Sequence, residues 1–255
     1  MMDAFPLLSV AILADSQHHF LHQTLESIAN QEEKNFEVLL LDSRPSYEWQ
    51  PFKCSFPLSV HQAEGQTEGA VMNRALTLSR GIYIQFLRPG ERFLSCQATA
   101  YVGQLAQENN CPEILYSAFL QKDPEQPPRA ATFPLHLIKQ GIAPTNLHAQ
   151  WFLRSALIAL GGFNPHYHRR PSFDALCALM KNHSRAVYSR RVFVDCERRP
   201  TTAIQTAGFA FETCKILYRR FGLWYALRWL FVQDRALLAR RLWKAIKDAF
   251  WGARA

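Results

Sequence analysis

The sequence predicts an α/β fold in which helices cover both faces of a largely parallel sheet. Four apolar, partly β-branched segments are typical of buried strands, and two amphipathic segments between them carry apolar residues at helical spacing. This alternation favours a doubly wound sheet, with a binding site at the carboxyl ends of its strands. The expected strands are residues 6–14, 35–42, 58–63 and 82–87, and the expected helices are residues 19–31 and 70–81, the second ending at Gly81.

The middle of the chain continues this pattern. A helix is expected around residues 95–107, a strand over 113–119, a strand-like or irregular piece at 146–153 and a helix over 172–182. The Pro-rich segment 121–134 is expected to be a flexible connection rather than a domain boundary.

The end of the chain differs from the rest in composition. The formal net charge is +8, and residues 212–255 hold ten Lys and Arg against three Asp and Glu. Trp, Leu and Phe alternate with these basic residues in two expected helices, broken near Gly222. Such stripes suit a helix on a membrane surface, and equally a helix that packs on its own domain or on a partner. We therefore divide the chain into a domain at 1–205 and basic amphipathic helices at 206–255.

Composition also bounds the setting of the protein. An acid, Asp3, precedes the first apolar run, and no uninterrupted apolar stretch reaches about 18 residues, so we expect neither a signal peptide nor a membrane span. The six cysteines form no CxxC pair, which favours reduced thiols in the cytoplasm. We expect no nucleic-acid partner, because the positive charge is confined to a hydrophobic tail.

Three blocks of the sequence resemble the family 2 nucleotide-sugar glycosyltransferases, which have the GT-A fold. PLLSVAILADSQHHFLHQTLESIANQEEKNFEVLLLD is similar to the opening of that family, and EGAVMNRALTLSRGIYIQFLRPGERF to the block leading into its Asp-rich turn. HAQWFLRSALIALGGFNPHY is similar to its acceptor-side block. The blocks keep the family's order over residues 6–182. The motif at Ala70–Asn73 resembles that of a bacterial branch of the family that builds extracellular polysaccharide.

The resemblance implies donor contacts at three positions. Asp42 ends the second strand, where the family places an aspartate against the nucleoside; an aspartate that caps a turn is the other interpretation. Asp15 follows the first strand and has the chemistry to bond a base or ribose, while an ordinary turn acid is an equal alternative. Asn73 matches an asparagine beside the nucleotide, and its alternative is a buried structural asparagine.

The turn Arg88-Pro89-Gly90-Glu91 stands where the family holds a divalent cation through Asp-x-Asp. Only Glu91 keeps a carboxylate, so Mn²⁺ or Mg²⁺ held there would bind weakly. Arg88 can take over the cation's task, because a guanidinium pairs bidentately with phosphate. In the alternative, Arg88 and Glu91 pair with each other or with solvent and have no part in catalysis.

The general base implied by the resemblance falls near residue 174. Without gaps the family's acidic pair aligns on residues 171–175, where Ser172 takes the base position and cannot serve. A two-residue shift gives the role to Asp174, which is otherwise an acid favoured by a helix N-terminus. His148 is a second candidate, for acceptor contact, with a structural histidine as its alternative. The basic loop 166–170 either grips a phosphate or is solvated surface.

Two hypotheses from different classes follow. In the first, the chain is an inverting glycosyltransferase that moves a sugar from a nucleotide-sugar donor to a polysaccharide, lipopolysaccharide or lipid-linked acceptor, held at the inner face of the membrane by its C-terminal helices. In the second, the chain is a catalytically silent relative that serves as a binding or assembly subunit, because acids are missing from the metal turn and from position 172. The sequence leaves the sugar, the nucleotide, the acceptor and the oligomeric state open.

Overall fold

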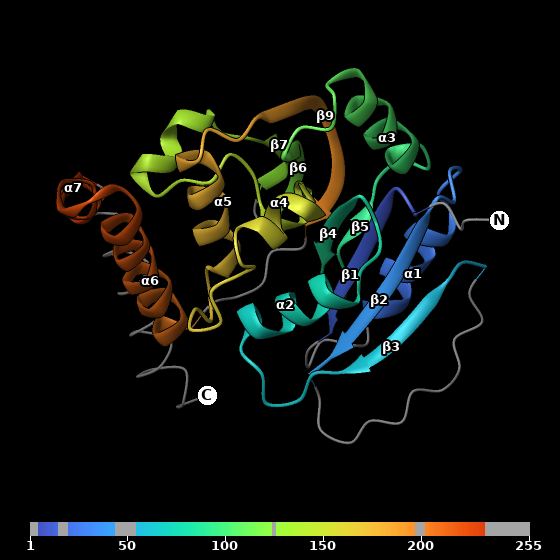
Figure 1. The fold of residues 1–255 in the computed structure, drawn as a ribbon, viewed down its shortest axis with the longest axis horizontal. Helices are drawn as coiled ribbons and strands as arrows, with labels where there is room; N and C mark the ends of the chain where they lie inside the picture. The colour runs from blue at the N-terminus through green and yellow to red at the C-terminus, as the bar shows by residue number, and fades with distance from the viewer. Residues whose placement is uncertain (1–4, 15–19, 44–54, 124–125, 197–201, 233–255) are drawn as a thin grey trace.

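The fold is built on one mixed sheet with helices on both faces (Figure 1). The computed structural model describes residues 5–14, 20–43, 55–123, 126–196 and 202–232. Over these residues the sheet has nine strands in the order β3-β2-β1-β4-β8-β6-β9-β5, with β7 paired to β6. The predicted α/β class is therefore confirmed.

The first half of the chain forms the parallel part of the sheet. Strands β3, β2, β1 and β4 run parallel, and in register Ala14 lies opposite Asp42, so the carboxyl ends of β1 and β2 meet at one edge. The helix expected at 70–81 starts at Glu68, because the Thr67 hydroxyl caps it by accepting from the Ala70 N–H, and it ends at Leu78. The elements are β1 (Leu8–Ala14), α1 (Leu21–Ala29), β2 (Phe36–Asp42), β3 (Leu58–Gln62), α2 (Glu68–Leu78) and β4 (Tyr83–Leu87).

The second half makes the sheet mixed. Strand β8 runs antiparallel to both β4 and β6, while β6 and β9 run parallel. The elements are β5 (Arg92–Phe93), α3 (Ala98–Glu108), β6 (Ile114–Asp123), β7 (Gln126–Ala131), η2 (Leu135–Gln140), η3 (Leu147–Ala149), β8 (Gln150–Leu153), α4 (Arg154–Ala159), α5 (Pro171–Lys181), β9 (Ala186–Cys196), α6 (Ala203–Phe221) and α7 (Leu223–Val232).

The expectation of a flexible connection over the whole Pro-rich segment 121–134 was wrong. Residues 126–131 form β7, which pairs antiparallel with the end of β6. Proline lacks the N–H that an inner strand needs, but an edge strand tolerates it. In the part of the chain that the structure describes, β7 pairs with β6 alone, so it is such an edge.

Two apolar layers, one on each face of the sheet, form the core. Strand β1 alternates between them: Val10 and Ile12 pack with α1 and α3, while Ala11 and Leu13 pack with the layer that holds α2, α4, α5 and α6. This period of two is the geometry of an extended strand. This packing fixes helices on both faces of the sheet, and the turns that follow the strands lie between them.

Helices α6 and α7 lie at the end of the molecule opposite β3 (Figure 1). Gly222, with φ +100°, separates them. Ile216, Leu217 and Trp229 on these helices are buried in the same core layer as α5. Within the described ranges no helix is long and apolar enough to cross a membrane.

Candidate functional site

A two-lobed cleft lies at the carboxyl ends of β1, β2 and β4. One lobe, of about 160 Å³, is lined by the ends of β1 and β2, among them Ala14 and Ser43. The other, of about 290 Å³, is bounded by the segment before β8 and the start of α5, and includes His148 and Ser172. Arg88, on the turn after β4, and Glu68, at the start of α2, line both lobes and so lie between them.

The turn Arg88–Glu91 has a fixed backbone. The Glu91 N–H donates to the Arg88 carbonyl at 3.0 Å, and Gly90 has φ +93°, a conformation that side-chain-bearing residues adopt at a cost. Pro followed by Gly at the two central positions suits this turn. The Gly90 N–H donates to the Thr24 hydroxyl of α1 at 2.9 Å. The hydrogen bond between Gly90 and Thr24 thus fixes the turn to α1.

The guanidinium of Arg88 pairs with Glu68 at the start of α2. Nη2 of Arg88 donates to Oε2 of Glu68 at 2.7 Å, and the two side chains are 28% and 17% exposed. Among the described residues no ion pair joins the side chains of Arg88 and Glu91, which was one of the two pairings that the non-catalytic interpretation allowed; the backbone N–H of Arg88 donates to Glu91 at 2.7 Å. Arg88 therefore presents a paired guanidinium at the wall between the lobes.

Glu91 and His148 lie in contact on the side of this wall that faces the larger lobe. Nδ1 of His148 is 2.6 Å from Oε2 of Glu91, and both side chains are largely buried, at 13% and 4% exposure. The same Nδ1 is 3.1 Å from the Phe86 carbonyl. Two residues singled out separately from the sequence, 57 positions apart, thus form one unit.

The larger lobe also holds buried polar atoms that lack a partner within the described residues. These are the Thr145 hydroxyl and Oε1 of Gln150, on residues that are 3% and 2% exposed. Buried polar groups are rarely left unsatisfied, so a ligand or water is expected to bond them.

A basic wall faces the same lobe, and α6 holds it in place. The Glu212 carboxylate accepts from the backbone N–H groups of His168, Arg169 and Arg170, each at 2.9 Å. The Arg170 guanidinium lies 3.7 Å from the centre of the Phe173 ring and donates from Nη1 to the Thr213 hydroxyl at 2.8 Å. Burial lowers the pKa of Arg170, as expected for a poorly hydrated cation.

Sequence reasoning missed Glu212 and Thr213, because their partners lie some forty residues away. Only the acid at Glu212 within the otherwise basic run of α6 was a signal, and it does not name a partner.

Asp174 is not brought to the cleft. Its two carboxylate oxygens accept from Nε and Nη2 of Arg220 on α6, at 2.7 and 2.8 Å, and Asp174 is 2% exposed. This hydrogen bond is the main reason that the pKa of Arg220 is raised. The base role expected for Asp174 therefore has no geometric support, because the helix face that carries Asp174 packs on α6 while Ser172 and Phe173 line the cleft.

The three predicted nucleotide contacts have different outcomes. Asn73 is engaged by the backbone of Phe163: Nδ2 donates to its carbonyl and Oδ1 accepts from its N–H, both at 2.7 Å. Both ends of the Asn73 amide thus connect α2 to the segment before α5. These bonds are those expected of a structural asparagine. Asp42 is fully buried at the end of β2. Asp15 lies outside the described residues.

The residues around the metal turn do not fit a divalent cation. Such an ion needs several oxygen ligands, and Oε2 of Glu91 already lies 2.6 Å from Nδ1 of His148 and accepts from the Arg88 N–H. Across the described ranges no group of three or more His, Cys, Asp or Glu is placed to hold a metal. The weak Mn²⁺ or Mg²⁺ site expected at Glu91 therefore gains no support from these neighbours.

Comparison with known proteins places the fold. No protein-family model and no curated protein matches this sequence. The structure is similar to that of S. aureus TarS 1-349, with 13% identity and a TM-score of 0.62 over 97% of this chain and 73% of that one; TarS 1-349 has also been solved with UDP and with UDP-GlcNAc. It is also similar to the mannosyltransferase PcManGT from Pyrobaculum calidifontis, solved with GDP-Man and Mn²⁺, with 13% identity and a TM-score of 0.64 over 99% of this chain and 77% of that one. At this identity the likeness establishes the GT-A fold, with helices at the C-terminus.

Proposed function

We propose that this GT-A fold chain is a glycosyltransferase that moves a sugar from a nucleotide-sugar donor to a glycan or lipid-linked acceptor, with inversion at the anomeric carbon. The observation that carries the proposal is the cleft, whose two lobes meet at Arg88. The smaller lobe takes the nucleoside, at the strand ends where ligands bind in open α/β sheets. The larger lobe takes the acceptor. The comparisons support this choice because TarS 1-349 and PcManGT were solved with sugar nucleotides or nucleotide.

Arg88 is the group that we assign to the diphosphate. Departure of a nucleoside diphosphate builds negative charge on the phosphate oxygens, and a guanidinium at the wall between the lobes can stabilise that charge through two parallel hydrogen bonds. Arg169 adds a second, exposed cation to the acceptor lobe. No step of this scheme is assigned to a metal, because Glu68 pairs with Arg88 and Glu91 lies against His148.

Calorimetric titration with UDP and GDP, with and without Mn²⁺, tests the proposal. We expect one nucleotide to bind without Mn²⁺, and Arg88→Met to weaken that binding about 10- to 100-fold, the range of a hydrogen bond between charged groups. Arg80→Met is the matched control, because Arg80 also pairs with a glutamate, Glu37, at 3.0 Å but lines neither lobe.

Two results contradict the scheme in different ways. No binding of UDP or GDP at millimolar concentration favours the second hypothesis, a catalytically silent binding or assembly subunit. Binding that requires Mn²⁺ and is unaffected by Arg88→Met retains the transferase and removes the role of Arg88.

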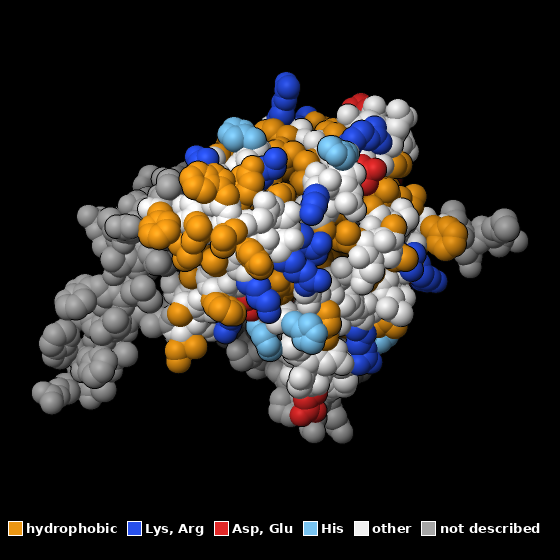
Figure 2. Space-filling view, turned by 60° about the vertical axis from the view of Figure 1, so that its left-hand side comes forward, with side chains coloured by type: hydrophobic (Ala, Val, Ile, Leu, Met, Phe, Trp, Pro, Cys, Tyr) orange, Lys and Arg blue, Asp and Glu red, His pale blue; other side chains and the backbone are white. Residues whose placement is uncertain are grey.

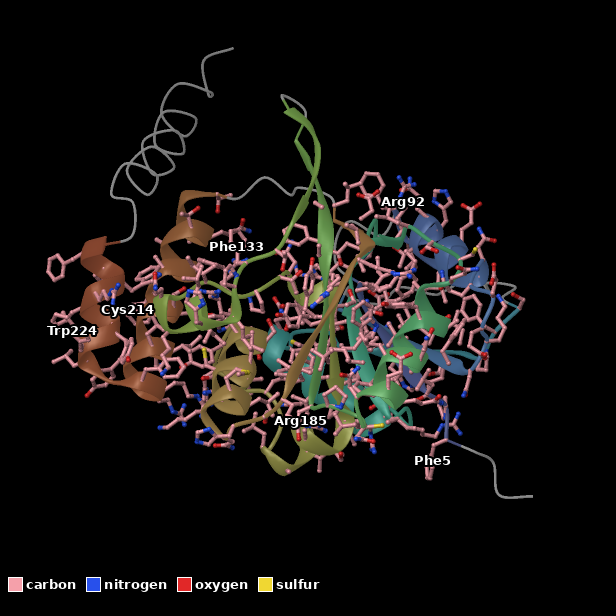
Figure 3. The ribbon with its side chains drawn as sticks, turned by 90° about the horizontal axis from the view of Figure 1, so that it is seen from above. Phe5, Arg92, Phe133, Arg185, Cys214 and Trp224 are labelled. Atoms are coloured by element: carbon pink, nitrogen blue, oxygen red, sulfur yellow. The ribbon has the colours of Figure 1, made fainter. Side chains whose placement is uncertain are left out.

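We further propose that α7 touches the inner membrane surface. Trp224 and Leu227 are 71% and 37% exposed and follow each other at helical spacing, while Ala226 and Trp229 on the opposite side are buried. Figure 3 shows Trp224 at the outer edge of α7, and Figure 2 shows hydrophobic side chains gathered beside Lys and Arg on this end of the molecule. Exposed Arg228 suits anionic headgroups.

Flotation with vesicles that contain anionic lipid tests this contact in the full chain. We expect Trp224→Glu with Leu227→Glu to reduce the floated fraction several-fold, because both changes place charge on the lipid-facing side. Phe5→Glu is the matched control, since Phe5 is equally exposed, at 71%, but lies near the opposite end. Equal flotation of all three proteins would remove the proposal for α7.

A further inference from the structure

We propose that Glu91 and His148 form a carboxylate–imidazole pair in which Nε2 of His148 takes the proton from the acceptor hydroxyl. This inference rests on the proposed function, since it needs a sugar donor in the neighbouring lobe. It reassigns Glu91 from a remnant metal ligand to a positioning residue, and it makes His148 the catalytic residue that touches the acceptor.

The partners of Nδ1 determine which nitrogen carries the proton. Nδ1 of His148 lies 2.6 Å from the Glu91 carboxylate and 3.1 Å from the Phe86 carbonyl, and both of these groups only accept hydrogen bonds. Nδ1 must therefore carry the proton. In the neutral imidazole this leaves Nε2 as the acceptor, which is the form that a general base requires.

The imidazole is held from several directions. Gln85 on β4 donates from Nε2 to the His148 carbonyl at 2.6 Å, which fixes the backbone beside the ring. The Glu91 oxygen that contacts His148 also accepts from the Arg88 N–H at 2.7 Å, so the proton acceptor and the residue assigned to the diphosphate share one anchor. Within the described residues, no hydrogen bond to Nε2 of His148 is present, and His148 lines the acceptor lobe.

The proton and electron balance of the step is complete. The acceptor oxygen forms a bond to the anomeric carbon as the bond from that carbon to the diphosphate oxygen breaks, and the electron pair leaves with the nucleoside diphosphate. The acceptor proton moves to Nε2 of His148, and the resulting imidazolium is stabilised by the Glu91 carboxylate at 2.6 Å. The proton then passes to solvent, so no oxidant, reductant or further reactant is needed.

Variants of both residues, tested in the full chain, examine this assignment. Release of UDP or GDP from the sugar nucleotide that binds is the measured turnover, and His148→Gln is expected to lower kcat about 100-fold or more with little change in nucleotide affinity. Imidazole added to His148→Gly is expected to raise the kcat of that variant at least tenfold, a rescue that a purely structural histidine would not permit. Glu91→Gln is expected to lose more activity than Glu91→Asp, and His22→Gln, an exposed site on α1, is the control.

A second measurement reads the geometry without turnover. Long-range ¹H–¹⁵N spectra of histidine-labelled protein, with His148→Gln used for assignment, are expected to show the Nδ1–H tautomer in the wild type and a mixture in Glu91→Gln. An Nε2–H tautomer, or full kcat in His148→Gln, overturns the inference while the transferase stands. Absence of nucleotide binding in the wild type overturns the proposed function instead, and the inferred catalytic role with it.

Discussion

The Asp174→Asn substitution separates the two roles considered for this residue. The change keeps the size of the side chain but removes the charge that Arg220 bonds at 2.7 and 2.8 Å. Removing one partner of a buried ion pair costs about 3–5 kcal/mol. Asp174 is 2% exposed, but the Arg220 side chain is 24% exposed and keeps some water, so we expect a smaller loss, about 2–3 kcal/mol. For a chain of this length that lowers Tm by roughly 4–12 °C.

Denaturation by urea, followed by circular dichroism, measures this loss in Asp174→Asn, Arg220→Met and the double variant. We expect the free energy of unfolding of the double variant to fall by about 1–3 kcal/mol less than the summed losses of the two single variants. The reason is that the second change removes a charge that has already lost its partner. Turnover is measured at a temperature where each variant is folded. An unchanged midpoint together with a kcat loss of about 100-fold would refute the structural role and return the base assignment to Asp174.

Three further substitutions test other contacts. Burial raises the pKa of Glu37, but hydrogen bonds from Arg80 and Ser9 outweigh it, so this pKa lies below its ordinary 4.5. The stability that the lowered pKa adds is present above pH 4.5 and is lost as pH falls through the lowered pKa. Glu37→Gln should therefore flatten the acid side of a curve of Tm against pH. Asn73→Ala should cost about 2–3 kcal/mol in urea denaturation and leave nucleotide affinity unchanged, because two backbone groups of one residue lose their partner. Glu68→Gln should tighten nucleotide binding severalfold in calorimetry, since Glu68 competes with a diphosphate for Arg88; weaker binding would contradict that competition.

The parallel half of the fold could be predicted because its local signals agree with its tertiary role. Strands β1, β2 and β4 are buried on both faces, so their sequences are largely apolar runs, each interrupted by one internal polar residue, Ser9, Glu37 or Gln85. The eleven residues of β9 were missed, since two arginines interrupt the run and Arg190 has φ +56°. That left-handed residue lies where the pairing of β9 with β6 shifts register, and such an irregularity removes the period of two on which a strand prediction depends.

The candidate site was predictable by residue but not by partner. Arg88, Glu91 and His148 were singled out from short motifs, and the structure brings all three to one cleft. Which of these residues contact each other could not be predicted from the sequence, because those contacts depend on how η3 and β8 lie against β4. Asp174 shows the converse: its position in a motif suggested chemistry, and only the packing of α6 on α5 reveals that it has a structural ion pair.

Two glutamates, Glu68 on α2 and Glu91 at the end of the turn, set the charge around Arg88 and His148. A divalent cation would bring positive charge to a diphosphate and would itself need carboxylates to hold it. Here each carboxylate instead bonds a protein group: Glu68 holds a guanidinium, and Glu91 holds an imidazole. Glu68 therefore balances the charge of Arg88 before the donor binds, and Glu91 keeps its negative charge beside the neutral imidazole. A diphosphate that displaces Glu68 from Arg88 would gain a cation that is already in position, while the Glu91–His148 contact does not depend on that exchange.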